Sequence, residues 1–347
     1  RGAAACLADD PGANAHGMAR VLVEDAEEAL GWAAACFHGH PSRALTLVGI
    51  TGTNGKTTTS YLLQHILEEA GVVTGRIGTV GYAFPSGEEP ASLTTPDAPA
   101  FQAALARMVR EGARAAVAEI SSHALLRRRV AGTAFACTVF TNLTQDHLDY
   151  HGTMEEYFAA KRLLFTDHPR MVEAVVNADD PYGRALAPDL GGHVVTFGLT
   201  GGDVRFEVAR LGPEGSAGTL RYPDGSVPLR LPLAGRFNAS NAAAALAAAW
   251  ALGLDMPKAA ARAMGIGAYV DFAHTPDALD RVLESLRGFT EGRLVCVFGC
   301  GGDRDRLKRP RMAEAAAKWA DLIVITADNS RSESTEDILD EIERGFP

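Results

Sequence analysis

Cysteines are few in this 347-residue sequence, and a long apolar segment is absent. The five cysteines are scattered, and only Cys296 and Cys300 lie close together, at the end of a predicted strand. That spacing favours neither a disulfide framework nor a metal knuckle, so we expect a reduced, cytoplasmic protein. No segment has the length of a membrane span, and no signal peptide is visible. Because the first residue is Arg1, we expect the native beginning to lie outside this chain.

Basic residues are also in deficit. Lys and Arg total 33 against 43 for Asp and Glu, which makes the net charge −10. An acidic protein lacks the positive surface that binds a phosphate backbone, so nucleic acid is not an expected partner. A small anionic substrate in a local basic pocket remains compatible with this charge. The apolar share of 47% is ordinary for a globular protein, and we expect a monomer that acts on small molecules.

Strand and helix patterns alternate along the chain, which predicts α/β domains with mostly parallel sheets. Before residue 265, strands are expected at 45–50, 115–120, 138–142 and 174–177, with a hairpin at 204–211 and 218–222. Helices are expected at 56–70 and in the alanine-rich stretch 241–252. After it, strands are expected at 269–272, 294–298 and 322–326, and helices from Pro276 and Pro310.

This layout predicts three domains. Residues 1–40 have a strand, a loop and an amphipathic helix, which indicates the remnant of an incomplete N-terminal α/β domain. Residues 41–264 are expected to form a central phosphate-loop domain, and residues 265–347 a C-terminal doubly wound, Rossmann-like domain. His40-Pro41-Ser42 has the composition of a linker between the first two.

The strongest motif runs from Gly52 to Thr58 and reads Gly-Thr-Asn-Gly-Lys-Thr-Thr. It follows a predicted buried strand and opens a helix, which is the position of a phosphate-binding loop. The glycines let backbone N–H groups approach phosphate oxygens. Lys56 supplies a cation for the β- and γ-phosphates, and the Thr57 hydroxyl can reach Mg²⁺. The alternative is a glycine-rich turn that binds no ligand.

Polar residues follow the next buried strands. Glu119 ends one of them, at the edge where an α/β sheet binds its ligands, and a carboxylate there is well placed to hold Mg²⁺. His147 comes soon after the next strand, and Lys161 lies on a predicted helix. Magnesium prefers oxygen ligands, and a protonated lysine cannot be a ligand. By themselves, His147 and Lys161 would therefore indicate only a solvated loop and a surface helix.

Together these motifs resemble those of the Mur ligases, whose relatives folylpolyglutamate synthase and cyanophycin synthetase share the short phosphate loop. Four further strings resemble the members that add the third peptide residue, usually meso-2,6-diaminopimelate, to a UDP-muramoyl dipeptide. They are TTP at 94–96, SSHAL at 121–125, FAHTPDAL at 272–279 and FGCGGDRD at 298–305. The resemblance covers nearly the whole chain. It implies an ATP-dependent, ADP-forming amide ligase of peptidoglycan synthesis that works through an acyl phosphate.

The resemblance also implies roles for individual residues. It implies that Lys56, Glu119, His147 and Lys161 are catalytic, and that residues 1–40 belong to a UDP-binding domain. Mg²⁺ would be held by Thr57, Glu119, His147 and Lys161, with Lys161 carbamylated to N6-carboxylysine, a modification that requires a neutral, buried amine. The residues implied for ATP are Gly52, Thr53, Asn54, Gly55, Lys56, Thr57, Thr58, Asn238, Asn241, Asp271, His274 and Lys308. Those implied for the dipeptide substrate are Thr94, Thr95, Ser122 and Arg129.

The expected amino-acid pocket departs from the family pattern. The diaminopimelate-adding enzymes carry Asp-Asn-Pro-Arg, whereas this chain has Asp328-Asn329-Ser330-Arg331. Arg331 and Arg304 remain, and a guanidinium suits the distal carboxylate of diaminopimelate. Loss of the proline frees one backbone φ and leaves the loop less rigid, so L-lysine and L-ornithine stay open as substrates. Without the family resemblance, Arg331 would fit a surface arginine that caps a helix equally well.

Two other classes of function compete with this interpretation. One is another Mur-like ligase, for cyanophycin or folylpolyglutamate, and the strings at 121–125 and 271–276 argue against it. The other is a nucleotide-binding relative without ligase activity. The intact set of Lys56, Glu119, His147 and Lys161 argues against that alternative.

Overall fold

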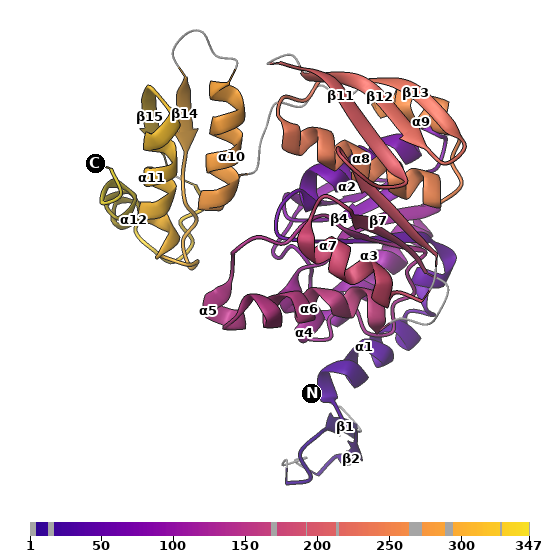
Figure 1. The fold of residues 1–347 in the computed structure, drawn as a ribbon. Helices are drawn as coiled ribbons and strands as arrows, with labels where there is room; N and C mark the ends of the chain where they lie inside the picture. The colour runs from indigo at the N-terminus through magenta and orange to yellow at the C-terminus, as the bar shows by residue number, and fades with distance from the viewer. Residues whose placement is uncertain are drawn as a thin grey trace.

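A computed structural model describes residues 5–12, 17–167, 172–191, 193–212, 215–263, 273–288, 294–326 and 328–346. Figure 1 shows three parts: a small N-terminal piece at the bottom, a large central body, and a C-terminal unit beside it. Within the described ranges, no helix combines the length and the apolar character that a membrane crossing requires.

The N-terminal piece consists of two short parallel strands and one helix. Strands β1 (Ala5–Ala8) and β2 (Ala19–Leu22) pair in parallel, and α1 (Ala26–Phe37) leads into the central body. The carboxylate of Asp25 accepts hydrogen bonds from the N–H groups of Glu27 and Glu28 and so caps α1. A short 3₁₀ turn (Pro41–Ala44) then enters the central sheet, at the predicted linker.

One sheet of eleven strands forms the centre of the molecule, in the order β13-β12-β11-β10-β9-β8-β3-β7-β4-β5-β6. Its middle strands pair in parallel, and both edges end in antiparallel hairpins. The bounds are β3 (Thr46–Thr51), β4 (Thr74–Ile77), β5 (Gly81–Phe84), β6 (Gly87–Pro90), β7 (Ala115–Glu119), β8 (Cys137–Phe140), β9 (Glu173–Asn177), β10 (Val194–Gly198), β11 (Val204–Gly212), β12 (Gly215–Tyr222) and β13 (Gly225–Leu231). The carboxyl ends of β3, β7 and β8 therefore meet at one edge, where the phosphate loop begins.

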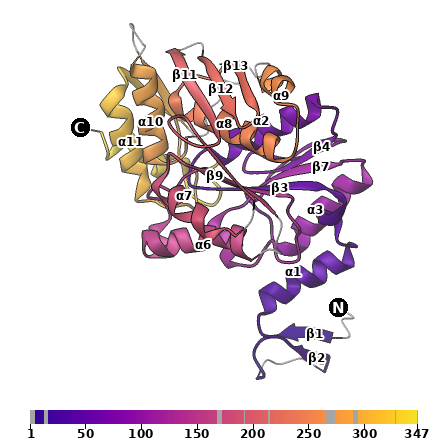
Figure 2. The same cartoon turned by 45° about the vertical axis from the view of Figure 1, so that its right-hand side comes forward.

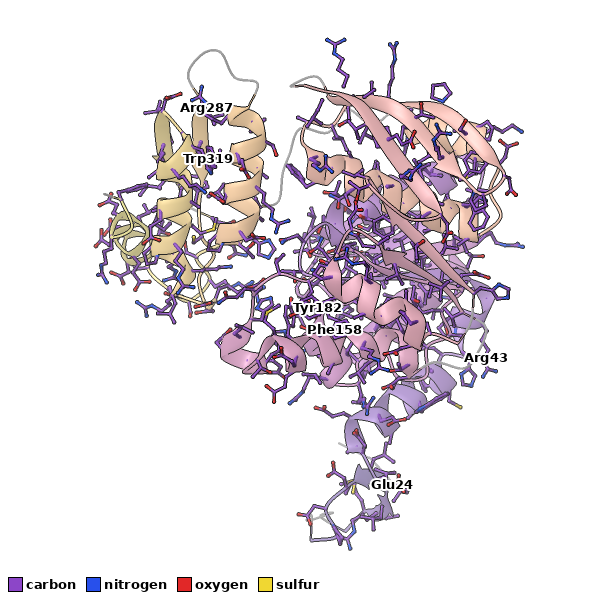
Figure 3. All side chains as sticks on the ribbon, viewed as in Figure 1. Glu24, Arg43, Phe158, Tyr182, Arg287 and Trp319 are labelled. Carbon is purple, nitrogen blue, oxygen red and sulfur yellow. The ribbon has the colours of Figure 1, made fainter. Side chains whose placement is uncertain are left out.

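Helices cover both faces of this sheet (Figure 2). One face carries α2 (Lys56–Glu69), α8 (Arg236–Ala251) and α9 (Met256–Ala263). The other carries α3 (Ala98–Arg110), α4 (Ser122–Leu126), α6 (Met154–Thr166) and α7 (Pro181–Leu186), with α5 (Leu148–His151) preceding α6. Small side chains let α8 pack closely, since residues 242–249 are almost fully buried. Figure 3 labels Phe158 of α6 and Tyr182 of α7, whose ring centroids are 5.1 Å apart.

The C-terminal unit has a small core of its own. Strands β14 (Val295–Phe298) and β15 (Leu322–Ile325) pair in parallel, and α10 (Pro276–Arg287), α11 (Lys308–Trp319) and α12 (Thr335–Glu343) pack with them. Leu279, Met312 and Ile338 lie in this core. Two residues labelled in Figure 3 make polar contacts across it: Trp319 donates to Asp280 at 2.6 Å, and Arg287 to Asp321 at 2.7 Å.

The predicted α/β class, with a mostly parallel central sheet, is confirmed. Most boundaries differ from expectation by one to three residues, and the helix expected at 241–252 begins earlier, at Arg236. The strand expected at 138–142 ends at Phe140, which leaves Thr141 and Asn142 in the loop above the sheet edge. The helix expected from Pro310 begins two residues earlier, at Lys308, which suits a proline because the first helical turn does not use its N–H. The strand expected at 269–272 lies outside the described residues.

Candidate active site

The phosphate loop has a backbone that requires its two glycines. Gly52 has φ +145° and Gly55 has φ +85°, a region that L side chains rarely adopt. A Cβ at Gly52 would lie 1.9 Å from Thr141 Oγ1, and one at Gly55 would lie 2.2 Å from Asn241 Oδ1. Both glycines therefore allow a close approach of the loop to its neighbours. Because the first N–H groups of an α-helix have no partner within the helix, those that open α2 can bind an anion in front of the loop.

Two lysines share one carbonyl of this loop. Lys56 Nζ donates to Gly52 O at 2.9 Å and to Thr53 O at 3.0 Å, and Lys161 Nζ also donates to Gly52 O at 2.9 Å. Lys161 is 1% exposed, and its ammonium lies 4.4 Å from the centre of the Tyr157 ring. Burial lowers the pKa of Lys161 well below its ordinary value, and the charge of Lys56 lowers it further. Burial also lowers the pKa of Lys56, against the opposing charges of Glu119 and Asp146.

Glu119 connects the loop to the end of β7. Its side chain is fully buried, and its carboxylate accepts hydrogen bonds from Thr57 Oγ1 at 2.9 Å and from Thr79 Oγ1 at 2.9 Å. The Thr79 N–H donates to the other carboxylate oxygen at 3.2 Å. A Cβ at Gly78 would lie only 2.2 Å from that oxygen, so the segment after β4 packs directly on the carboxylate. Thr57 and Glu119 thus offer hard oxygen atoms side by side.

The residues expected to contact the dipeptide gather around the same strand end. Thr95 Oγ1 donates to Glu119 O at 2.8 Å, and Arg129 donates to Thr95 O at 2.9 Å. The hydroxyl groups of Thr94 and Thr79 are 3.2 Å apart. Ser122, which is 1% exposed, pairs its hydroxyl with His151 Nε2 at 2.8 Å. All four predicted residues therefore lie near Glu119, in segments that come from three separate parts of the chain.

His147 lies at the start of α5 in an unusual backbone conformation, with φ +53°. Its ring is 3.4 Å from Asp146 Oδ2 and perpendicular to the ring of His123, with centroids 5.1 Å apart. Burial lowers the pKa of His147 to about 4, against the charge of Asp146, so the imidazole is neutral at neutral pH. A neutral imidazole is the form that can ligate a metal.

The site offers oxygen ligands of the kind that magnesium prefers. Across the described ranges, no three His, Cys, Asp or Glu side chains are arranged to hold a metal ion together. The predicted set has only Glu119 and His147 of those types, with Thr57 as a hydroxyl donor. Lys161 would add an oxygen ligand only when carbamylated. Its amine suits that modification, because burial lowers its pKa and so favours the neutral form.

A cavity of about 610 Å³ extends from the loop toward α8 and α10. Asn54, Gly55 and Thr58 line it from the loop, and Asn241 lines it from α8, while Asn238 lies one helical turn away and donates to Ala234 O. The C-terminal unit closes the cavity through the start of α10, where Asp277 accepts a hydrogen bond from Asn54 at 3.3 Å. The volume and the polar lining suit a nucleoside attached to phosphates at the loop.

The C-terminal residues expected at the substrates divide into two groups. Lys308 donates to His274 O at 2.9 Å, close to the first turn of α10. Arg304, Asp328, Asn329 and Arg331 lie in the loops that follow β14 and β15. No hydrogen bond joins this second group to the phosphate loop within the described residues. Asp271 lies outside the described residues.

Three residues that the sequence patterns did not indicate lie in the site: Thr79, Asn142 and His151. Asn142 exchanges two hydrogen bonds with the backbone of Asn54, each 3.0 Å long, and so fixes the middle of the loop. A signal was present for Asn142, because it directly follows a strand at the ligand edge of the sheet. Thr79 and His151 carried no comparable signal, because no strand was predicted directly before either residue and their partners are 40 and 29 residues away.

Two family models match this chain. The Mur ligase middle domain matches residues 50–249, and the Mur ligase, glutamate ligase domain matches residues 259–346. The chain belongs to the Mur ligase family. Within this family, a UDP-N-acetylmuramoyl-L-alanyl-D-glutamate--2,6-diaminopimelate ligase from Synechococcus elongatus is 46% identical over 346 residues, which cover 94% of this chain and 70% of the relative. The ligase of the same name from Geobacter metallireducens is 44% identical, and the alignment covers 100% of this chain and 72% of that relative.

Solved structures agree with this assignment. A structure of a UDP-N-acetylmuramoyl-L-alanyl-D-glutamate--2,6-diaminopimelate ligase superimposes with a TM-score of 0.70 at 33% identity, over 94% of this Mur ligase and 72% of that chain. Folylpolyglutamate synthase from Mycobacterium tuberculosis, complexed with ADP and AMPPCP, superimposes with a TM-score of 0.73 at 19% identity. The superposition covers 92% of this chain and 84% of that chain. The second likeness shows the shared fold alone.

Proposed function

We propose that this Mur ligase joins meso-2,6-diaminopimelate to the D-glutamyl carboxylate of UDP-N-acetylmuramoyl-L-alanyl-D-glutamate, with ATP converted to ADP and phosphate. One observation carries the proposal. The hydrogen bond between Thr57 and Glu119 brings the phosphate loop to the strand end around which Thr94, Thr95, Ser122 and Arg129 gather. A phosphate donor and a carboxylate acceptor would therefore meet at one place, as a phosphoryl transfer requires.

The chemistry follows from this placement. A carboxylate oxygen of the D-glutamyl residue attacks the γ-phosphorus of ATP, and the bond from that phosphorus to the bridging oxygen of ADP breaks. The amine of the amino acid then attacks the acyl carbon, loses a proton, and releases phosphate as the amide forms. Lys56 and the N–H groups of the loop stabilise the negative charge that shifts among the phosphate oxygens.

Magnesium would be held by Thr57, Glu119, His147 and a carbamylated Lys161, and it would neutralise phosphate charge during the transfer. Asn142 and Thr79 would keep the loop and Glu119 in place. The support is that Thr57 and Glu119 are hydrogen-bonded at 2.9 Å and that Lys161 is fully enclosed beside the loop.

Nucleotide binding would use Gly52, Thr53, Asn54, Gly55, Lys56, Thr57, Thr58, Asn238, Asn241, Asp271, His274 and Lys308. The cavity of about 610 Å³ between the loop and α10 supports this set. The amino acid would be held by Arg304, Asp328, Asn329 and Arg331 in the C-terminal unit. Closure of that unit on the central domain would then shield the acyl phosphate from water.

We also propose a division of labour among three domains. Residues 1–40 would belong to the part that binds UDP, residues 41–264 to the ATP-binding ligase domain, and residues 265–347 to the part that binds the amino acid. The proposed reaction takes place in the cytoplasm, where nucleotide substrates are available. All the residues named come from one chain, which is compatible with a monomer.

The experiment measures phosphate release with ATP, Mg²⁺, the UDP-muramoyl dipeptide and one amino acid, each omitted in turn. We expect release to require all four and kcat/KM to be highest for meso-diaminopimelate, because lysine and ornithine lack the distal carboxylate that an arginine would bind. A higher kcat/KM for lysine or ornithine would show that the ligase class is right and the amino acid wrong. Release that ignores the amino acid would contradict the ligase activity itself.

A further inference from the structure

Two strained residues face each other in the C-terminal unit. Asp303 has φ +52° and Arg331 has φ +48°, and the described residues include only three other non-glycine residues with positive φ. Such conformations cost on the order of 1–3 kcal/mol each and persist only where the surroundings impose them. The first follows β14 and the second follows β15, so two loops carry one strained residue each.

Hydrogen bonds tie the two strained residues together. Ser332, next to Arg331, donates its hydroxyl to Asp303 Oδ1 at 2.6 Å and its N–H to Asp303 Oδ2 at 3.3 Å. The carboxylate of Asp303 therefore uses both of its oxygens to hold the residue after Arg331. Within the second loop, the Arg331 N–H donates to Asn329 Oδ1 at 3.3 Å.

Further hydrogen bonds and close backbone contacts fix the two loops. The Asp303 N–H donates to Glu333 Oε1 at 2.6 Å, and the fully buried Arg309 donates to both Glu333 oxygens, at 2.8 and 2.9 Å. Gly302 N donates to Asn329 O at 2.9 Å, and a Cβ at Gly302 would lie 1.9 Å from Ser330 O. The two loops thus pack backbone against backbone, with little freedom to slide.

This arrangement joins the backbone segments that carry two arginines. Arg304 follows Asp303 and Arg331 precedes Ser332, so the Asp303–Ser332 contact joins the backbones that carry both guanidinium groups. Desolvation and the charge of Arg331 both lower the pKa of Arg304. Two like charges that a rigid frame holds near each other repel, and an anion placed between them relieves that repulsion.

We propose that Asp303, acting with Ser332, is a positioning residue for the amino-acid substrate: it fixes the turn of Arg331 against Arg304 so that both guanidinium groups can receive one distal carboxylate. This rests on the proposed function, in which these loops hold the amino acid. Ser330 contributes to the same turn, because its hydroxyl is 2.5 Å from Thr335 Oγ1 at the start of α12. A hydroxyl contact there restores some of the rigidity that the proline of the family pattern would supply.

The test compares Asp303→Ala, Ser332→Ala and Asp303→Asn in the full chain. Asparagine keeps an oxygen that can accept from Ser332 and tolerates positive φ, so it is the conservative variant. Asp305→Ala is the matched control, because that carboxylate lies in the same loop and accepts from Leu307 N. For each protein, KM is measured separately for ATP, the dipeptide, diaminopimelate and lysine, together with the thermal midpoint.

We expect Asp303→Ala to raise KM for diaminopimelate about tenfold and Ser332→Ala about threefold, the loss expected when a hydrogen bond that orients a charged group is removed. Asp303→Asn and Asp305→Ala should stay within about twofold, and KM for ATP should not change. The ratio of kcat/KM for diaminopimelate over lysine should fall in Asp303→Ala, an effect that general destabilisation would not produce.

An unchanged KM for diaminopimelate in both alanine variants would overturn the proposal. So would an equal rise in the KM of all substrates with a lowered thermal midpoint, since that pattern indicates a structural role only. If the wild-type protein rejects diaminopimelate, the proposed function fails, and the positioning claim is then judged with the amino acid that it accepts. Equal KM for that amino acid in wild type and Asp303→Ala would overturn the claim.

Discussion

Ser122 Oγ lies 2.8 Å from His151 Nε2, and both side chains are buried. The His151 ring stacks on Tyr157 with centroids 4.7 Å apart, and Tyr157 Oη accepts a hydrogen bond from Thr53 Oγ1 at 3.3 Å. A continuous set of buried contacts therefore links a residue proposed for the dipeptide to the phosphate loop. This link makes His151 part of the scaffold of the site.

Unfolding of the protein should depend on pH through His151. Burial, followed by the charges of His123 and Lys161, lowers the pKa of His151 from 6.5 to about 4. Between these values the unfolded chain binds a proton that the folded chain does not, so stability falls as pH drops from 6.5 to 4 and is unaffected above 6.5. On unfolding, His151→Gln should bind about one proton fewer than the wild type. Its urea midpoints at pH 7.5 and pH 5 should therefore differ by less than those of the wild type. Identical differences for the two proteins would show that His151 is accessible to protons when folded.

Glu119 should be required for chemistry more than for folding. Glu119→Gln keeps one oxygen for Thr57 or Thr79 but removes the negative charge that faces the loop. We expect kcat to fall about 10²–10³-fold and the Mg²⁺ concentration for half-maximal rate to rise, as measured by phosphate release during a Mg²⁺ titration. Glu111→Gln, at a partly buried carboxylate paired with Arg107, is the control and should behave as wild type. A Glu119→Gln protein with an ordinary Mg²⁺ dependence would remove Glu119 from the metal site.

Gly55 should be intolerant of a side chain for two separable reasons. Gly55→Ala places a Cβ 2.2 Å from Asn241 Oδ1 at φ +85°, whereas Gly71→Ala has a similar φ of +80° with open space around it. Both variants should lose about 1–2 kcal/mol of stability from backbone strain, measured by urea denaturation. Only Gly55→Ala should also raise KM for ATP, by more than about tenfold, because its loop must shift. Equal KM values in the two variants would show that the loop adapts without cost.

Carbamylation of Lys161 should be detectable directly. Its amine is 1% exposed and its pKa is lowered by burial and by Lys56, so a neutral amine is available to react with CO₂. Protein equilibrated with ¹³C-bicarbonate should show one carbamate carbon signal in its NMR spectrum, and Lys161→Ala should lose both that signal and activity. A signal that persists in Lys161→Ala would assign the carbamate to another amine, and complete absence of a signal in active wild-type protein would exclude the modification.

The sequence predicted the parts of the fold that depend on local periodicity. The strand expected at 45–50 and found at 46–51, the glycine-rich turn after it and the helix from Lys56 were expected together, because a buried β run, a glycine turn and a helix start follow one another. The hairpin of β5 and β6 was not expected. Its second strand is polar and exposed, and it is held by an ion pair between the buried Arg76 and the exposed Glu88, which no local pattern encodes.

The residues of the site also differ in how far local sequence patterns predict them. Lys56, Thr57 and Glu119 could be proposed from strand ends and loop chemistry alone. The choice of Thr95, Ser122 and Arg129 depended on family resemblance, because Thr95 lies 24 residues from its partner Glu119 and 34 residues from its partner Arg129. The strained pair of Asp303 and Arg331 could not be expected from either source, since positive φ at a non-glycine residue has no sequence signature.

In the proposed reaction, a carboxylate activated at the phosphate loop becomes an acyl phosphate, and an isotope label on that carboxylate follows this step. The D-glutamyl carboxylate of the dipeptide is labelled with ¹⁸O and turned over with ATP, Mg²⁺ and meso-diaminopimelate, and the released phosphate is analysed by mass spectrometry. We expect one ¹⁸O atom per phosphate, because the oxygen that attacks the γ-phosphorus leaves with it when the amine attacks the acyl carbon. Phosphate that carries no ¹⁸O, released at the same rate as the amide forms, would contradict the account.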